Sequence, residues 1–145
     1  MTARAAVLLA ACCLVIVLAL VLGVGIVSHG ILRHIVQTAP LWPAIVLGLR
    51  RHELSKWCAL PGLIFWLILM VCIWLFLLGW AHVVSGTFTP VEIAMTIVCA
   101  VASIAGIVFA LRQRTATSPI LAAALLALFA LLQFAAFRIS ALPGM

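Results

Sequence analysis

Apolar side chains occupy four long, nearly uninterrupted stretches of this chain. They cover approximately residues 5–27, 61–82, 90–111 and 119–139, and each approaches the ~20 helical residues that cross a hydrocarbon core. Apolar positions follow one another directly instead of alternating with polar ones, which indicates helices and not barrel strands. The pattern predicts four transmembrane helices in a single membrane domain, residues 1–145.

Proline and hydroxyl residues mark where the last two helices begin. Thr89, Pro90 and Glu92 have the spacing of a capping box with proline at the first helical position. Ser118 precedes Pro119 in the same way. Glu92 is therefore interpreted as a helix cap, and not as a group that carries protons.

Residues 28–57 are the one extended stretch outside these helices. Apolar and polar faces separate at helical spacing over residues 31–37, which is typical of a helix lying in the membrane interface. A Pro-Leu-Trp-Pro sequence ends that helix, and the apolar run 44–49 is too short to cross. We expect an amphipathic, interfacial segment with Trp42 and Trp57 anchored among the headgroups.

Composition makes lipid the solvent of this chain. Hydrophobic residues make up 69% and charged residues 7%, whereas soluble domains are roughly half apolar and about a quarter charged. This excludes a soluble enzyme and a secreted disulfide module. The expected fold is an all-α integral membrane protein, a four-transmembrane-helix bundle with an amphipathic or interfacial segment between the first and second helices.

Basic residues set the expected orientation. The chain has eight Lys and Arg residues against two acidic ones, and six of the eight fall in two connections between apolar stretches. Because cytoplasmic loops of membrane proteins are enriched in Lys and Arg, both connections are expected in the cytoplasm and both termini outside, in a bacterial inner (plasma) membrane. The six residues are Arg33, Arg50, Arg51, Lys56, Arg112 and Arg114.

Small residues at four-residue spacing predict where helices pack closely in lipid. Such stripes occur on the first and third helices, whereas the second carries aromatic residues such as Trp66 and is expected to face lipid or a partner over much of its surface. One amide lies deep in the fourth helix, where we expect it to hydrogen-bond a neighbouring helix. These candidate packing residues are Ala19, Gly23, Ala102, Gly106, Ala110 and Gln133.

Between the interfaces, the four apolar stretches contain no Asp, Glu, Lys, Arg or His. Ion-coupled transporters and pumps place ionisable residues there, so this class is disfavoured. The five cysteines form no C-x-x-C, the histidines lack the spacing of a haem or metal site, and no catalytic motif occurs. No catalytic residue, cofactor or metal is predicted. Nucleic-acid binding is not indicated either, because no aromatic side chains interleave with the basic ones.

The expected function is non-enzymatic. We expect an accessory or scaffolding protein that binds anionic headgroups of the lipid bilayer, other membrane-protein subunits or itself. One alternative is a small homodimeric transporter. Another is a lipid-modifying enzyme that uses the basic 28–57 segment, with His52 or Glu53 as acid or base. The residues expected to contact lipid or a partner are Arg33, Arg50, Arg51, Lys56, Trp42 and Trp57.

Overall fold

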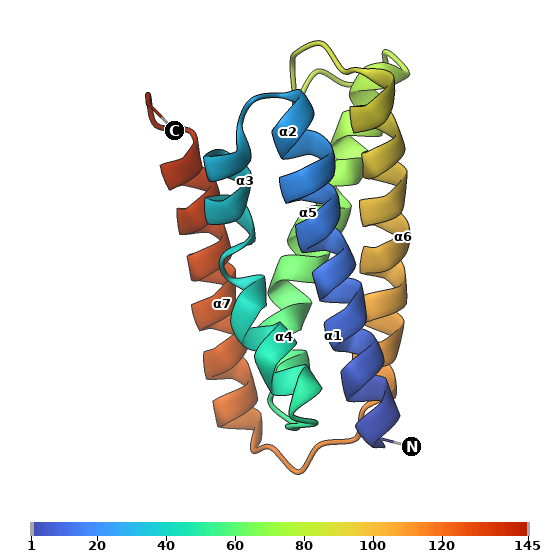
Figure 1. Cartoon of the computed structure of the whole chain (residues 1–145). Coiled ribbons are helices and arrows are strands. Elements are labelled where there is room, and N and C mark those ends of the chain that lie inside the picture. The colour runs from blue at the N-terminus through green and yellow to red at the C-terminus, as the bar shows by residue number, and fades with distance from the viewer. Residues whose placement is uncertain (1, 145) are drawn as a thin grey trace.

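The computed structural model describes residues 2–144, and every regular element in that range is a helix. The order is α1 (Thr2–Leu18), the π-helix η1 (Ala19–Val24), α2 (Gly25–Val27), α3 (Ile31–Thr38), α4 (Leu41–Leu49), α5 (Ser55–Leu77), α6 (Pro90–Arg112) and α7 (Pro119–Ser140). The first three elements form one continuous rod (Figure 1). This rod, α5, α6 and α7 are each long and apolar enough to cross a membrane, which confirms the four predicted helices.

The starts of α6 and α7 match their sequence signals. Thr89 accepts a hydrogen bond from the backbone N–H of Glu92 at 3.3 Å, and the Glu92 carboxylate accepts one from the backbone N–H of Thr89 at 2.7 Å. The capping box is therefore confirmed. The Ser118 hydroxyl likewise accepts from the backbone N–H of Leu121 at 3.3 Å.

The start of α5 differs from its expected position. The helix begins at Ser55 and ends at Leu77, so Pro61 lies inside it. Ser55 and Lys56 suggested a loop, yet Ser55 is fully buried and the Lys56 ammonium donates to the Gln113 carbonyl at 2.9 Å. Polar residues therefore begin this helix, because its first turn is packed against neighbouring protein.

The largest difference concerns residues 28–57. Two short helices from this segment, α3 and α4, turn back alongside the first rod instead of lying across one end of the bundle (Figure 1). α3 packs against η1 and α7, and α4 packs against α1 and α5. The segment therefore runs along the bundle and packs on its helices, whereas the sequence predicted a segment lying in the membrane interface.

The polar face predicted for α3 is divided between two environments, because Arg33 is exposed whereas Gln37 is buried. The polar side chains of Gln37 and Thr38 are 4% and 0% exposed, whereas Ile31, Leu32 and Ile35 are exposed. An interfacial helix would turn its polar side outward. Polar residues inside and apolar residues outside are what a helix surrounded by lipid requires.

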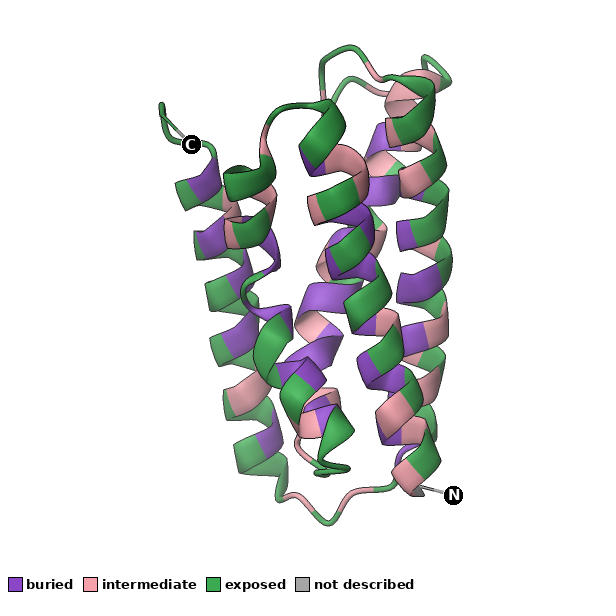
Figure 2. Cartoon of the chain, viewed as in Figure 1, coloured by how far each residue is buried: buried purple, intermediate pink, exposed green. Residues whose placement is uncertain are grey.

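The whole bundle follows the same arrangement. Figure 2 shows buried residues on the faces that the helices turn toward one another and exposed residues on the outer faces. The outer face of α7 is made of large apolar side chains, including Leu131 and Phe134. Buried positions include the polar residues Ser103 and Gln133.

The extra pass changes where the chain ends. The N- and C-termini lie at opposite ends of the bundle (Figure 1). We call these the N-terminal end, which also holds the α4–α5 turn and the α6–α7 connection, and the C-terminal end, which also holds the α2–α3 turn and the α5–α6 connection. Two termini on one side would need an even number of passes. Here α3 and α4 add a further run along the bundle, which places the two ends of the chain at opposite ends of it, whereas both were expected on one side.

Candidate functional site

Six of the eight Lys and Arg side chains gather at the N-terminal end of the bundle. Arg33 was expected beside Arg50, Arg51 and Lys56. It lies instead in the first turn of α3, at the C-terminal end, and the chain runs through α3 and α4 before it reaches the other three. Arg138, in the last turn of α7, is also at the C-terminal end. The six at the N-terminal end are Arg4, Arg50, Arg51, Lys56, Arg112 and Arg114.

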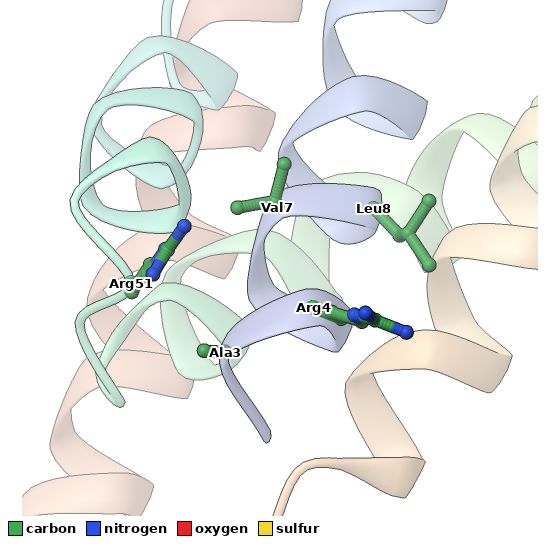
Figure 3. Close-up of a pocket in the computed structure, with 5 residues that line it drawn as sticks. All are labelled: Ala3, Arg4, Val7, Leu8 and Arg51. Carbon is green, nitrogen blue, oxygen red and sulfur yellow. The ribbon is translucent and has the colours of Figure 1, made fainter. Parts of the chain in front are cut away.

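Two of these arginines flank a groove on the outside of α1. Its volume is about 500 Å³, and it is lined by Ala3, Arg4, Val7, Leu8 and Arg51. Arg4 comes from the first turns of α1 and Arg51 from the α4–α5 turn, with Ala3 and Val7 between them in the view of Figure 3. The groove therefore combines two guanidinium groups with an apolar helix face.

Arg51 adopts a backbone conformation that is unusual for its residue type. Its φ is +58°, in the left-handed region. The backbone N–H of Arg51 donates to the Gly48 carbonyl at 3.0 Å and that of His52 to the Leu47 carbonyl at 2.8 Å, which makes a Schellman motif at the end of α4. Glycine usually fills this position, and another residue costs about 1 kcal/mol there. Strain of this kind concentrates at functional positions.

The groove has no acidic residue in its lining. The chain contains only two acidic side chains. Glu53 accepts a hydrogen bond from the backbone N–H of Ala116 at 2.9 Å, and Glu92 serves the capping box at the other end. An anion from outside the chain would therefore meet two cations whose charge the groove itself does not neutralise.

The two tryptophans expected to lie among headgroups occupy different places. Trp42 is 47% exposed at the α3–α4 junction, which lies partway along the bundle (Figure 1). Trp57 is half-buried near the start of α5, with the Lys56 ammonium 4.4 Å from its ring centroid. Lys56 and Trp57 thus belong to the contact between α5 and the α6–α7 connection, and only Trp42 presents a largely exposed ring.

The small-residue stripes lie at helix contacts. Ala102, Gly106 and Ala110 are buried on α6, where an added Cβ at Gly106 would lie 3.0 Å from Leu63 and 3.3 Å from Cys12. On the first rod, Ala19 is buried, and an added Cβ at Gly23 would lie 2.6 Å from Met95.

A further close contact, this one against the backbone of α1, was not predicted from the sequence. An added Cβ at Gly48 of α4 would lie 2.8 Å from both the Ala10 Cβ atom and the Ala6 carbonyl oxygen of α1. Ala44 and Gly48 are four residues apart and both are buried. This is the small-residue spacing already used for the other helices, and it was available in the sequence.

Gln133 belongs to a buried chain of hydrogen bonds between α7 and α3. Its side-chain amide donates to the Gln37 backbone carbonyl at 2.9 Å. The Gln37 side chain donates in turn to the Ser140 hydroxyl at 3.0 Å, which donates to the Phe137 carbonyl at 2.7 Å. This chain joins the last helix to the broken pass formed by α3 and α4.

A second hollow, of about 390 Å³, lies toward the C-terminal end of the bundle. Its walls come from η1, α3, α5 and α6. Arg33, His34 and Glu92 line it together with aliphatic side chains such as Met70 and Ile73. We call it the C-terminal cavity.

Trp66 lines the C-terminal cavity. Its side chain is 1% exposed, and its Nε1 has no hydrogen-bond partner. The sequence had placed this residue on a helix facing lipid or a partner. Trp66 is thus an inward-facing ring on this helix, and the aromatic content of α5 carried no information about which of its rings turn inward.

His52 and Glu53, the expected acid or base of a lipid-modifying enzyme, both accept hydrogen bonds from backbone N–H groups. His52 Nδ1 accepts from the backbone N–H of Leu54 at 3.2 Å, and Glu53 holds Ala116 as described. Within residues 2–144, no group of three or more His, Cys, Asp or Glu side chains could hold a metal ion. No known family model, curated protein or solved structure matches this chain.

Proposed function

We propose that this chain is a non-enzymatic accessory protein of the plasma membrane that holds an anionic phospholipid at its N-terminal end. The observation that carries the proposal is the groove that Arg4 and Arg51 both line, with no acidic residue in its lining. A headgroup phosphate would accept hydrogen bonds from the two guanidinium groups, since arginine matches the geometry of phosphate oxygens. An acyl chain would lie along Val7 and Leu8 of α1.

The charge distribution supports an orientation for this protein. With six basic residues at the N-terminal end and two at the other, the N-terminal end lies in the cytoplasm. The N-terminus is then inside and the C-terminus outside. Anionic lipids of the inner leaflet meet the groove in this orientation.

Lipid retention in native mass spectrometry tests the proposal. The purified protein, in detergent micelles doped with phosphatidylglycerol or phosphatidylcholine, is expected to retain one phosphatidylglycerol in preference to phosphatidylcholine. Arg4→Gln should lower the retained fraction about fivefold, since one basic residue near an anionic headgroup contributes ~1 kcal/mol. The matched control is Arg138→Gln, an exposed arginine at the other end, which should leave retention unchanged.

Arg51→Gly separates lipid binding from folding. Glycine fits the left-handed position, so this variant should unfold at a higher temperature than the wild type in lipid-free micelles. Retention of phosphatidylglycerol should nevertheless fall about fivefold, because a guanidinium is lost. A variant that is more stable and also retains the lipid fully would show that Arg51 is only a helix cap, and the proposed site would be abandoned.

A further inference from the structure

We propose that one acyl chain of the bound phospholipid lies in a second groove, between α1 and α6, so that the lipid is held by its tail as well as by its headgroup. The inference rests on the lipid site proposed at Arg4 and Arg51, and it specifies the ligand as a long-chain anionic phospholipid instead of a small free anion. The second groove has a volume of about 440 Å³. Its lining comes from α1 and α6 alone, and we call it the α1–α6 groove.

The lining of the α1–α6 groove suits a hydrocarbon chain. Ala11 and Cys12 line it from α1, and Ala102 and Ala105 line it from α6, so small side chains leave a hollow between the two helices. No side chain of the lining carries a charge, a hydroxyl or an amide. A chain seated between two helices makes more dispersion contacts than a chain on the outside of one helix, because each wall contributes its own.

The two grooves meet at Leu8, which lines both of them. Arg4 lies four residues before Leu8, a spacing that places both residues on one face of α1. In Figure 3 the side chains of Arg4 and Leu8 extend from the same side of the α1 ribbon. The arginine that would bind the headgroup is therefore at the N-terminal mouth of the α1–α6 groove.

The length of the α1–α6 groove matches one leaflet of a membrane. Its farthest lining residue on α1 is Val15, eleven residues beyond Arg4, which corresponds to ~16 Å along a helix. The hydrocarbon core of a membrane is about 30 Å thick, so one leaflet supplies about half of it. With Arg4 among the headgroups, the groove ends near the middle of the membrane, where the acyl chains of that leaflet also end.

Filling the α1–α6 groove tests the proposal. Ala11 is an exposed residue in the lining, so the ring of Ala11→Phe would occupy the groove without entering the packed interior of the bundle. In the native mass spectrometry assay described above, this variant should retain dioleoyl phosphatidylglycerol about threefold less than the wild type, because the ring takes the place of part of the chain. The matched control is Ala127→Phe, at an exposed alanine of α7 outside the groove, which should leave retention unchanged.

Dihexanoyl phosphatidylglycerol separates the chain from the headgroup. Its short chains end before Ala11, which lies ~10 Å beyond Arg4 along the helix. Retention of this lipid should therefore be the same in Ala11→Phe as in the wild type. Arg4→Gln should lower the retention of both lipids, because both carry the same headgroup.

The two variants distinguish failure of this inference from failure of the headgroup site. If Arg4→Gln lowers the retention of dioleoyl phosphatidylglycerol and Ala11→Phe does not, the chain lies elsewhere, and the inference is overturned while the headgroup site remains. If Arg4→Gln changes the retention of neither lipid, the headgroup site fails and the inference fails with it. Equal losses of the long and the short lipid in Ala11→Phe would also overturn the inference, because the ring would then act on the headgroup site and not on the chain.

Discussion

Gln133 donates a hydrogen bond to the Gln37 backbone carbonyl, which has no partner within its own helix. The Gln37 carbonyl lies in the last turn of α3, where helix carbonyls lose their intrahelical partners. Pro40 has no N–H for a 3₁₀-type bond to this carbonyl, and α3 has ended at Thr38, before Leu41, whose N–H would be its α-helical partner. Within an apolar environment such a carbonyl needs a donor from elsewhere in the protein, and the Gln133 amide supplies it at 2.9 Å.

Gln133→Leu should therefore destabilise the fold. The substitution keeps the approximate size of the side chain but leaves the Gln37 carbonyl without a donor, at a cost of about 1–3 kcal/mol. The measurement is the free energy of unfolding in mixed micelles with increasing denaturing detergent.

Ser103→Ala is the control for this experiment. Ser103 is also fully buried on a helix, but its hydroxyl has no hydrogen-bond partner. Its replacement should change stability much less than Gln133→Leu. Equal losses for the two variants would mean that the contact between Gln133 and Gln37 adds nothing to stability.

At the scale of elements, the sequence predicted the four uninterrupted helices and missed the broken pass. Length and hydropathy identify a helix only when its apolar residues are continuous, and the prolines divide residues 31–49 into two pieces that are each too short. Arg33 and Gln37 then resembled the water-facing side of an interfacial helix. Which way a polar face turns depends on whether neighbouring helices offer it partners, and Ser140 and Gln133 are distant in sequence.

The candidate sites were less predictable than the helices. The C-terminal cavity draws its walls from η1, α3, α5 and α6, so it exists only once α3 is known to stand beside the others. Arg4 and Arg51 likewise come together only because α4 descends along α1. Arg51 was among the residues expected to contact lipid. Its position near Arg4 could not be predicted, because it depends on how α3 and α4 pack along the bundle.

Gly48→Ala should disrupt the contact between α4 and α1 more than Gly106→Ala disrupts the contacts of α6. The new methyl at Gly48 would lie 2.8 Å from the Ala6 backbone oxygen, which cannot move aside, whereas at Gly106 it would meet the Leu63 side chain at 3.0 Å. Overpacking of this kind costs about 1–3 kcal/mol. At Gly106 the better helix propensity of alanine offsets part of that cost.

Thermal unfolding of both variants in the same detergent provides the comparison. We expect Gly48→Ala to unfold at the lower temperature. The reverse order would mean that α4 is held loosely against α1 and that the broken pass contributes little to the bundle.

At the scale of the whole molecule, the position of the two termini at opposite ends of the bundle predicts that they lie on opposite sides of the membrane. A reporter before Met1 should be found in the cytoplasm and one after Met145 outside, as measured by reporter fusions or by cysteine accessibility. Both reporters on one side would contradict this arrangement. Reporters on opposite sides but exchanged would keep the fold and reverse the proposed orientation.

The same assay measures how strongly the basic residues set that orientation. Changing Arg50, Arg51 and Lys56 to glutamine leaves three basic residues at the N-terminal end against two at the other. A difference of one residue is too small to fix the orientation, so we expect a mixture of both orientations. A single, unchanged orientation would mean that basic residues do not determine it in this protein.

The hydrogen bonds between α3 and α7 also impose an order on biosynthesis. Gln37 and Ser140 stand 103 positions apart, so α3 has left the ribosome long before its partners on α7 are translated. Until then the α3–α4 junction exposes polar groups that lipid cannot solvate. The nascent chain must therefore shelter this junction, in the insertion machinery or in water, while the later helices enter the bilayer. The α3–α4 segment therefore gains its full set of hydrogen bonds only after α7 has been inserted.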